Sequence, residues 1–576
     1  MERVSQRRFA QTLGAIFRIP LDRMEQGQFS SVYIATTHHS SNRCGGNNKM
    51  KKNNALLWIV FVAVVAFSNP AHSQVSSELR IDPLLLVSLK ECRNITNNLR
   101  NGLFPGWDFR KTPVLFYRPN VQELLINYPH KPKGFSLYSG FNPLGDDTIY
   151  VRNDTTLLPY DDQNTSTEVE SIRVLVVADP FSSMRNQLQD IVERPKEWAS
   201  TWLKNWQFIP NPYNKLQVIL HEAFHVYQNE KAPDKGANET VVAQYPPLDP
   251  ENNALYVLEG SILKDALFAQ ESKARLEKIK EFVAVRSYRQ SRLDSSFVEY
   301  ENLNEYSEGL AKYVEYKFMK IGEAIEPTTE MSFHQGFKGY RGILSKKFRV
   351  AMDNMVNIVA VNDDRFGNKF GSGPLRFKLY DLGACQGLLL DYTMPRWKER
   401  IFQPTAFLTD LLKESVALKA DELKRYLDLA KEEYKYDEAF RNKVDFEKEG
   451  KKKIDEKVSS ILKTEKTLVK ILYGGVTKNA RVARFTPFGV TQVSKQSAIY
   501  EMVPALIIFK KGVMLDFRQA IPVLVDQEKQ QIIFSIDTTP SKLIPDSQNR
   551  LDIAEFSLTT PMDIQHEANT VHIRLK

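Results

Sequence analysis

The pattern of apolar residues changes near Gly475, and that change limits the possible folds of this chain more than any other feature. Before it, over residues 196–415, apolar side chains recur every three to four positions, the spacing of helices that bury one face, and helices are predicted at 250–285, 303–322 and 376–392. After it, apolar and polar residues alternate, as in ALIIFKKGVMLDF, where KKG is predicted to form a hairpin turn between two strands. The sequence therefore predicts an α+β protein with a mainly helical core and a C-terminal antiparallel β domain.

Two further segments complete the predicted domain organisation, since 576 residues are too many for one hydrophobic core. The segment 74–195 contains the short apolar runs TPVLFYRP and SIRVLVVADP and is predicted to hold strands beside a helix. The segment 408–474 is dense in Lys and Glu and is predicted to be a charged helical connector. We expect a main unit made of 74–195 and the helical segment 196–407, followed by the connector over 408–474 and by a β domain over 475–576.

The N-terminal region has the composition of an export signal. A basic start, Met50-Lys51-Lys52, precedes the apolar run ALLWIVFVAVVAF and the small-residue cleavage site AHS. This order predicts a secretory signal peptide over 50–73, because the run is shorter than the ~20 residues that span a bilayer. Residues 1–49 are then predicted to be an untranslated upstream segment, the alternative being a genuine leader with an uncleaved membrane anchor. The mature protein is expected to be periplasmic or secreted, with no integral membrane span.

Charge and cysteine content argue against two classes of protein. The net charge is +8, but residues 1–73 hold nine Lys and Arg against three Asp and Glu, so six of the eight excess charges lie there. The two that remain give no reason to expect nucleic acid as a partner. After cleavage only Cys92 and Cys385 are left, so no disulfide scaffold is expected.

The stretch HEAFHVYQ contains the motif H-E-x-x-H at His221, Glu222 and His225. Asn211 and Pro212 offer a helix start upstream of it. On this helix one face is apolar, and the histidines fall on a different face, one turn apart. The apolar face consists of Leu216, Ile219, Ala223 and Val226. Two imidazoles one turn apart can bind a single Zn²⁺, while Glu222 stands beside the metal as a general base that holds and deprotonates a water molecule.

A catalytic zinc site needs a third protein ligand and an open fourth position. The residues after His225 do not continue the metzincin pattern, so a downstream carboxylate is the natural choice. One candidate is Glu308 in NEYSEGLAKYVEYK, where Gly309 and Ala311 are small enough to let the helix pack close to the metal helix. The alternative third ligand is Glu259 in NNALYVLEGSILKDAL, which lies on an apolar face and therefore needs a buried partner.

These residues resemble the zincin metallopeptidases of gluzincin type, in which H-E-x-x-H is completed by a glutamate on a later helix. The segments HEAFHVYQ, YVLEGSIL, NEYSEGLAKYVE and YDLGACQGLLLDYTMPRWK together resemble a set of exported zincin-like bacterial proteins, over roughly residues 105–400. The resemblance implies a zincin subdomain of strands and helices with a largely helical lower half. It also implies that His221, His225 and Glu308 are zinc ligands and that Glu222 is the general base.

One departure from the family concerns the acid that orients a histidine ligand. Thermolysin-like gluzincins carry this acid four residues after the ligand glutamate, but here Lys312 follows Glu308 at that distance. The orienting acid is therefore expected elsewhere in the chain. An electrophilic helper for the oxyanion is also expected, and the candidates are Tyr380, Tyr313 and His334.

The expected function is hydrolysis of peptide bonds in a peptide or protein substrate, with zinc polarising the scissile carbonyl and Glu222 moving the proton. An alternative is a catalytically silent zincin-like protein that binds or assembles partners in the envelope or outside the cell, through its β domain. Because a pure scaffold needs no general base, Glu222 favours the enzyme. A third hypothesis is an envelope protein without a metal, in which the motif arises by chance.

Overall fold

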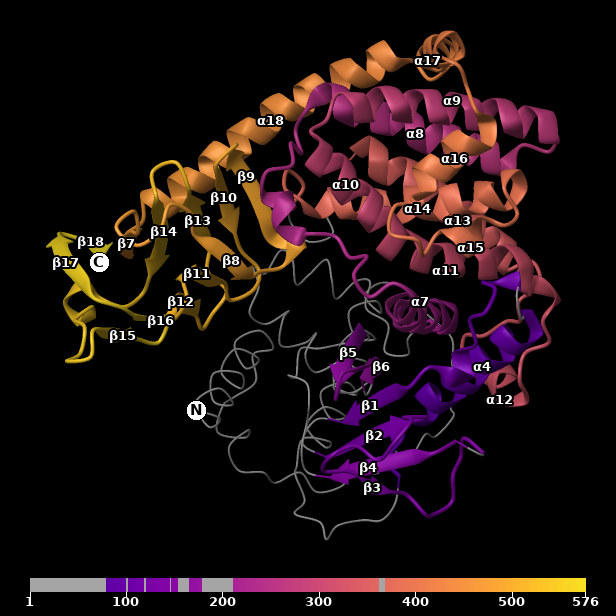
Figure 1. The fold of residues 1–576 in the computed structure, drawn as a ribbon, viewed down its shortest axis with the longest axis horizontal. Helices are drawn as coiled ribbons and strands as arrows, with labels where there is room; N and C mark the ends of the chain where they lie inside the picture. The colour runs from indigo at the N-terminus through magenta and orange to yellow at the C-terminus, as the bar shows by residue number, and fades with distance from the viewer. Residues whose placement is uncertain are drawn as a thin grey trace, which may run out of the picture. The chain divides into compact units, whose positions relative to one another are not determined.

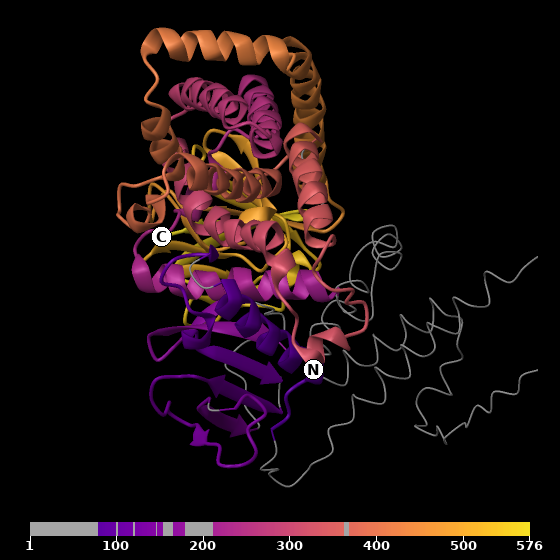
Figure 2. The ribbon, with the colours of Figure 1, turned by 90° about the vertical axis from the view of Figure 1, so that its right-hand side faces the viewer.

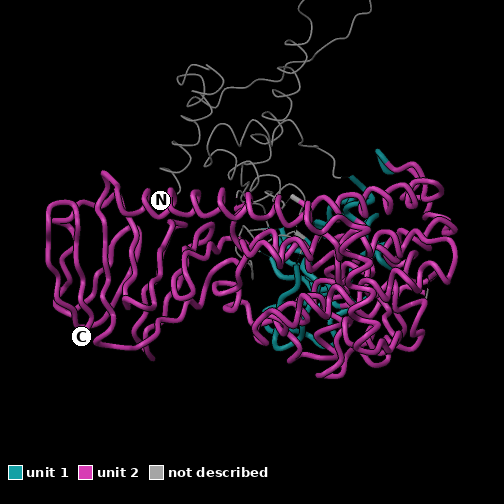
Figure 3. Tube along the Cα trace, turned by 90° about the horizontal axis from the view of Figure 1, so that it is seen from above, with its two compact units in different colours: residues 1–90, 113–215, 334–336 teal, residues 91–112, 216–333, 337–576 magenta. Residues whose placement is uncertain are grey.

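The computed structural model describes most of the chain after residue 78, in these ranges: 79–99, 102–118, 121–145, 147–153, 165–178, 211–361 and 368–576. The predicted signal peptide and the segment before it lie outside the described residues. The chain divides into two compact units (Figure 3). The first unit comprises residues 1–90, 113–215 and 334–336, and the second comprises residues 91–112, 216–333 and 337–576.

The first unit contains a six-stranded sheet in the order β3-β4-β2-β1-β6-β5. Its strands are β1 (Val114–Arg118), β2 (Gln122–Ile126), β3 (Ser136–Leu137), β4 (Ile149–Asn153), β5 (Thr165–Val169) and β6 (Ile172–Ala178). The central strands β1 and β6 run parallel, and the other neighbouring pairs run antiparallel. Side chains on both faces of β1 are buried, which explains its continuous apolar sequence. The strands predicted at TPVLFYRP and SIRVLVVADP are confirmed as β1 and β6.

In the second unit the helices gather at one end and the strands at the other (Figure 1). The helices are α8 (Pro250–Phe268), α9 (Ser272–Ser291), α10 (Ser295–Asn304), α11 (Leu310–Ile321), α12 (Thr329–Ser332), α13 (Leu344–Val361), α14 (Gly373–Thr393), α15 (Trp397–Arg400), α16 (Leu408–Val416), α17 (Ala420–Glu433) and α18 (Tyr436–Leu462), with most of α7 (Pro212–Lys231) and the second half of α4 (Pro83–Leu99). Helix α14 is buried along almost its whole length and contacts α8, α11, α13 and α16, so it forms the centre of the helical part. The helix predicted over 376–392 is confirmed within α14.

The long helix suggested over 250–285 is wrong as a single element, because α8 and α9 are separate helices joined at Ala269. Helix α8 begins with Asp249 as its N-cap and Pro250 in its first turn, and it ends where Ala269 leaves the helical conformation. Helix α9 then packs back along α8, and α17 lies over α9 (Figure 2). No Gly or Pro stands at this junction, so the reversal carries no sequence signal.

The β domain consists of two sheets that enclose a common hydrophobic core. The seven-stranded sheet has the order β17-β18-β7-β14-β13-β10-β9, and the five-stranded sheet has the order β15-β16-β12-β11-β8. The strands are β7 (Thr467–Leu472), β8 (Arg481–Arg484), β9 (Val490–Ser494), β10 (Ser497–Tyr500), β11 (Leu506–Lys510), β12 (Val513–Phe517), β13 (Val523–Asp526), β14 (Gln531–Ile536), β15 (Arg550–Asp552), β16 (Phe556–Thr559), β17 (Met562–Glu567) and β18 (Thr570–Leu575). The predicted hairpin is confirmed, since β11 and β12 pair antiparallel and Gly512 between them has a φ of 80°.

Two details of the predicted β domain are wrong. Strand β7 pairs with β14 and β18, so the domain begins before Gly475. The pairing of β7 with β18 is parallel, so the domain is not wholly antiparallel. The start of β7 is concealed in the sequence because Lys463, Glu465 and Lys466 continue the charged composition of the connector.

The charged connector is helical, as α16, α17 and α18, but α18 also buries one face. This helix contacts α8 at the helical end of the unit and β14 in the β domain (Figure 1). Its residue Ile461 joins a hydrophobic cluster with Leu468 and Ile533 of the seven-stranded sheet. The connector therefore fixes the β domain against the helical part by apolar burial as well as by the covalent chain.

The two cysteines of the described chain, Cys92 and Cys385, are buried free thiols and form no bridge. The sulfur of Cys385 lies 3.7 Å from Met352 Sδ and 3.4 Å from Met355 Sδ, so these three side chains fill the core beside α14. Within the described ranges, no helix combines the length and the apolar composition that crossing a bilayer requires.

Five buried charges form a network inside the helical part. Glu259 pairs with Arg286 and Arg289, and these two arginines also pair with Glu305 and Glu301 respectively. The N–O distances are 2.7–2.8 Å, and each of the five side chains is at most 1% exposed. Every charge has an opposite partner, as a buried charge requires.

We expect Glu301→Gln to destabilise the protein at pH 7 by about 3–5 kcal/mol, because Arg289 loses a charged partner inside the core. Burial raises the pKa of Glu301, but Arg289 outweighs burial and holds this pKa below its ordinary value. A carboxyl whose pKa is lower in the folded state stabilises the fold fully above its unfolded pKa of about 4.3, and this contribution is lost as the pH falls through the folded pKa. Scanning calorimetry should therefore show that the difference in free energy of unfolding between the variant and the unsubstituted chain shrinks below about pH 4. A difference that does not depend on pH would contradict this account.

Candidate metal centre

Helix α7 presents the two histidines of the H-E-x-x-H motif. Its start is fixed by Asn211, whose side-chain oxygen accepts hydrogen bonds from the backbone N–H groups of Tyr213 and Asn214 at 3.1 and 3.3 Å. The predicted helix start is thus confirmed. The predicted apolar stripe is buried and consists of Leu216, Ile219, Ala223 and Val226. Its burial leaves His221 and His225 on a different face of the helix, one turn apart.

Glu308 stands on a π-helical turn, η4 (Glu305–Gly309), between α10 and α11. Such turns are rare and occur frequently at functional sites. The backbone of this turn touches α14 directly, because a Cβ added to Gly309 would lie 2.8 Å from the Cα of Gly383. Gly309 was predicted to allow close packing on the metal helix, but the close contact is with α14.

The side chains of His221, His225 and Glu308 converge on one point. The Oε2 atom of Glu308 lies 3.5 Å from Nε2 of His221 and 3.4 Å from Nε2 of His225. Ligand atoms bound tetrahedrally to Zn²⁺ at 2.0–2.1 Å lie about 3.3 Å apart, so these two separations suit a metal, and all three ligand atoms lie within 4.8 Å of one another. The three side chains remain 10%, 18% and 19% exposed, which leaves the group open to solvent. This group could bind a metal ion.

The second nitrogen of each imidazole faces an acceptor oxygen. His221 Nδ1 lies 2.8 Å from Glu315 Oε1, and His225 Nδ1 lies 3.0 Å from Gln228 Oε1. The Gln228 amide is fixed in this orientation because its Nε2 donates to the carbonyl of Tyr306 at 2.8 Å. Both Nδ1 atoms therefore carry protons, and whenever a ring is neutral its Nε2 atom turns a lone pair toward the Glu308 carboxylate.

These lone pairs and the carboxylate oxygen need positive charge between them, which either protons or a metal ion can supply. At separations of 3.4–3.5 Å they repel one another unless protons or a metal ion intervene. Protons on the Nε2 atoms would turn the rings into imidazolium partners of Glu308, and Glu308 and Glu315 favour the charged form of His221. One divalent cation supplies the same charge at a single point and accepts all three ligand atoms.

The electrostatics of the group keep its carboxylates ionised. Burial lowers the pKa of His221, but Glu308 and Glu315 outweigh burial and raise this pKa to about 10. Burial raises the pKa of Glu308, yet the two histidines hold it well below its ordinary value. Burial also raises the pKa of Glu315, but Lys312 and His221 lower it, and the Lys312 ammonium lies 2.9 Å from the Glu315 carboxylate. Both glutamates are therefore negatively charged at neutral pH, as metal binding requires.

Two other predicted site residues lie beside this group. Glu222 follows His221 on α7 and is half-buried. Burial raises the pKa of Glu222, an effect that the neighbouring histidines reduce, and a raised pKa suits a group that takes up and returns a proton near neutral pH. The Tyr380 ring lies 6.3 Å from the His221 ring, and its hydroxyl accepts a hydrogen bond from Arg376 Nη2 at 3.3 Å.

The remaining predicted site residues have other partners. The carboxylate of Glu259 is bound by the two arginines of the buried network, so the geometry favours Glu308 as the third ligand. The hydroxyl of Tyr313 donates to Asp391 at 2.9 Å. His334 belongs to the first unit, where its Nδ1 lies 2.7 Å from the carbonyl oxygen of Gln335.

Three residues around the group were missed in the sequence. Glu315 supplies the orienting acid, and its position seven residues after Glu308 is a detectable signal because two helical turns return to the same face. Gln228 follows His225 by three residues and is detectable in the same way. Arg376 Nη2 lies 3.4 Å from Glu308 Oε1, but 68 positions separate these residues, and no local spacing indicates the contact.

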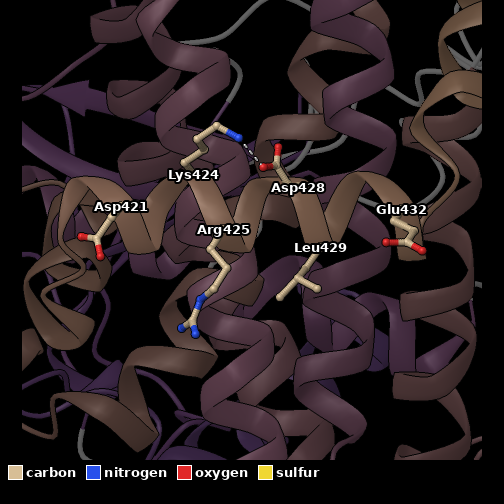
Figure 4. A pocket seen from close by; sticks show the side chains of 6 residues that line it. All are labelled: Asp421, Lys424, Arg425, Asp428, Leu429 and Glu432. Carbon is tan, nitrogen blue, oxygen red and sulfur yellow. Dashed lines mark hydrogen bonds and ion pairs between the residues drawn. The ribbon is translucent and has the colours of Figure 1, made fainter.

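A surface hollow on α17 includes none of these residues (Figure 4). It is lined by Asp421, Lys424, Arg425, Asp428, Leu429 and Glu432. The ion pair between Lys424 and Asp428 measures 2.6 Å, and both side chains are mostly exposed. Such a pair on one helix is a common feature of solvated helix surfaces. Leu429 is the one apolar residue among the six that line the hollow, whereas a small-molecule site has a mainly apolar lining.

Comparisons of the chain with protein-family models, with curated proteins and with solved structures give no match. The interpretation of the group as a metal centre therefore depends on its geometry and on the chemistry of its side chains. The resemblance to gluzincins remains a prediction.

We expect Glu308→Gln to weaken Zn²⁺ binding by more than about 100-fold, because it removes the only carboxylate among the three proposed ligands. Loss of a ligand should cost more affinity than loss of an outer-shell partner, which costs about 10–100-fold. Glu259→Gln tests the alternative third ligand. It should destabilise the fold, because it breaks the buried network, but the folded variant should still bind zinc, since the Glu259 carboxylate contacts arginines of that network. Competition with a chromophoric chelator measures both affinities. Loss of zinc from the Glu259 variant, with zinc retained by the Glu308 variant, would reverse the assignment of the third ligand.

Proposed function

We propose that this chain is a zinc-dependent peptidase of gluzincin type, in which His221, His225 and Glu308 hold the metal and Glu222 is the general base. The observation that carries the proposal is the orientation of the two imidazoles. Both Nδ1 atoms face acceptor oxygens, and both Nε2 atoms face one carboxylate oxygen at 3.4–3.5 Å. A divalent cation satisfies this arrangement directly.

The ligand set favours zinc with an open coordination position. Two histidines and a glutamate are a known set for catalytic zinc, and such sites keep a fourth position for water or substrate. The same set can hold iron(II) in oxygenases. A glutamate directly after the first histidine ligand, with a raised pKa, is what hydrolysis needs and favours zinc chemistry here.

A zinc ion in this position would polarise the scissile carbonyl and lower the pKa of a bound water toward about 7. Glu222 then removes the proton from the attacking water and returns it to the leaving amine. Glu315 and Gln228 keep both imidazoles in the tautomer that offers Nε2 to the metal. The Tyr380 hydroxyl, beside Arg376 and the His221 ring, is our candidate donor to the developing oxyanion.

The proposed substrate is a peptide or protein met outside the cytoplasm, since a signal peptide is predicted over 50–73. Glu222 is the residue that separates this proposal from a catalytically silent zincin-like binding protein. Such a protein can use the histidines and Glu308 to hold a structural metal, but it does not need a general base at Glu222.

We expect Glu222→Gln to bind Zn²⁺ as tightly as the unsubstituted chain and to cleave peptides roughly 10²–10⁴-fold more slowly, because only the proton transfer is removed. Cleavage of a quenched fluorescent peptide library by the zinc-loaded protein measures the effect. Glu230→Gln is the matched control, because Glu230 lies on the same helix and its side chain is 69% exposed.

Equal activity in Glu222→Gln and in the unsubstituted chain would exclude Glu222 as the general base. A zinc-loaded chain that cleaves no member of the library would instead favour the silent binding protein. No zinc binding at all would contradict both of these functions.

A further inference from the structure

The β domain reaches the helix that carries Arg376 and Tyr380. Its short helical turn η6 (Pro487–Gly489) contacts α14, and the ring of Phe488 stacks 5.4 Å from the ring of Phe377. The backbone of η6 also approaches α14 closely, since a Cβ added to Gly373 would lie 3.4 Å from the carbonyl oxygen of Phe488.

Hydrogen bonds fix this contact at the first turn of α14. The backbone N–H of Ser372 donates to the carbonyl of Val490 at 2.9 Å, and the Ser372 hydroxyl oxygen accepts from the Val490 N–H at 3.2 Å. The Asn368 side chain donates to the carbonyl of Phe488 at 3.2 Å and accepts from the Thr491 hydroxyl at 3.0 Å. Residues 487–491 of the β domain are therefore held in register with the start of α14, one helical turn before Arg376.

Arg376 connects this contact to the candidate metal centre. Its Nη2 lies 3.4 Å from Glu308 Oε1, on the carboxylate that faces the histidines. Its Nη1 donates to Asn304 at 2.9 Å and pairs with Glu239. The guanidinium carbon lies 5.3 Å from the ring centroid of Phe488, within the range of a cation–π contact.

The glutamate partner of Arg376 is also held near the β domain. Glu239 belongs to the short helical turn η3 (Glu239–Ala243), which contacts β9. The side chain of Gln492 in β9 donates to the carbonyl of Gln244, the residue that ends η3, at 2.7 Å. One strand of the β domain and the turn before it thus contact both elements that orient the guanidinium.

We propose that Phe488 is a positioning residue of the metal centre, and that its ring holds the Arg376 guanidinium against Glu308. The β domain is then part of the site and not a separate accessory module. This inference rests on the metal centre of the proposed function. A guanidinium that stacks on an aromatic ring loses freedom to turn away, so its charge stays beside one oxygen of Glu308 and leaves the other oxygen directed at the metal.

Metal affinity in three variants tests this role. We expect Phe488→Ala to weaken Zn²⁺ binding about 10-fold, the lower end of what outer-shell partners contribute, and to change the visible spectrum of the Co²⁺-loaded protein. Phe488→Tyr keeps an aromatic face and should retain both the zinc affinity and the Co²⁺ spectrum of the unsubstituted chain. Phe485→Ala is the matched control, since Phe485 lies three residues earlier, is also half-buried and packs on Tyr500. This control should retain the zinc affinity and the spectrum of the unsubstituted chain.

A double-mutant cycle separates positioning through Arg376 from general loss of structure. If Phe488 acts through Arg376, Phe488→Ala causes no further loss of affinity in an Arg376→Met background. An unchanged affinity in Phe488→Ala, an equal loss in Phe485→Ala, or a full additional loss in the Arg376→Met background would overturn the inference while the proposed function stands. Absence of zinc binding by the unsubstituted chain would overturn the proposed function and this inference together. Thermal melts of each variant confirm that the compared proteins are folded.

Discussion

One carboxylate oxygen of Glu308 faces two imidazole nitrogens, and this arrangement needs positive charge at its centre. The distances of 3.4 and 3.5 Å are too short for three electron-rich atoms to face one another without protons or a metal ion between them. Glu315 and Gln228 fix the opposite side of each ring, so the histidines cannot relieve the repulsion by changing tautomer without losing a hydrogen bond. Contacts of the turn that carries Glu308 with α14 and with the buried charges hold Glu308 at this point.

The π turn that carries Glu308 is anchored from two directions. The backbones at Gly309 and Gly383 meet with no room for a Cβ atom, which fixes the turn against α14. Glu305, at the start of the same turn, pairs with Arg286 at 2.8 Å and accepts a hydrogen bond from Gln386. The buried charge network and the metal centre therefore share one structural element. A buried ion pair is weak evidence for stability, but here it also fixes the register of a functional turn.

The sequence is sufficient to predict those parts of the fold that follow from local periodicity and capping. Asn211, Pro212 and the apolar stripe predict α7 and the face of its histidines, and the KKG turn predicts the β11–β12 hairpin. The junction at Ala269 and the early start of β7 were not predictable in this way, because neither has a distinctive residue. The parallel pairing of β7 with β18 joins segments far apart in the chain, which no local pattern indicates.

The candidate site likewise contains residues that a local sequence pattern indicates and residues that only tertiary contacts bring together. His221, Glu222 and His225 follow from the motif, and Glu315 could have been found from its position two turns after Glu308. The sequence left Glu308 and Glu259 open as the third ligand, and only the tertiary contacts of Glu259 with two arginines favour Glu308. The contact of Arg376 with Glu308 is tertiary, and so is the contact of Phe488 with Arg376, which crosses from the β domain to the helical part. The resemblance to gluzincins indicated the predicted ligands, but its pattern places the orienting acid four residues after Glu308, where this chain has Lys312. The carboxylate that faces His221 belongs to Glu315, seven residues after Glu308.

The most direct test of the account is anomalous diffraction at the zinc absorption edge from crystals of the zinc-loaded protein. The account predicts one peak within about 2.0–2.2 Å of His221 Nε2, His225 Nε2 and a Glu308 oxygen, with Glu315 and Gln228 still bound to the Nδ1 atoms. No peak at this position, with Glu308 paired to protonated histidines instead, would show that the group is a structural ion pair and would contradict the metal centre.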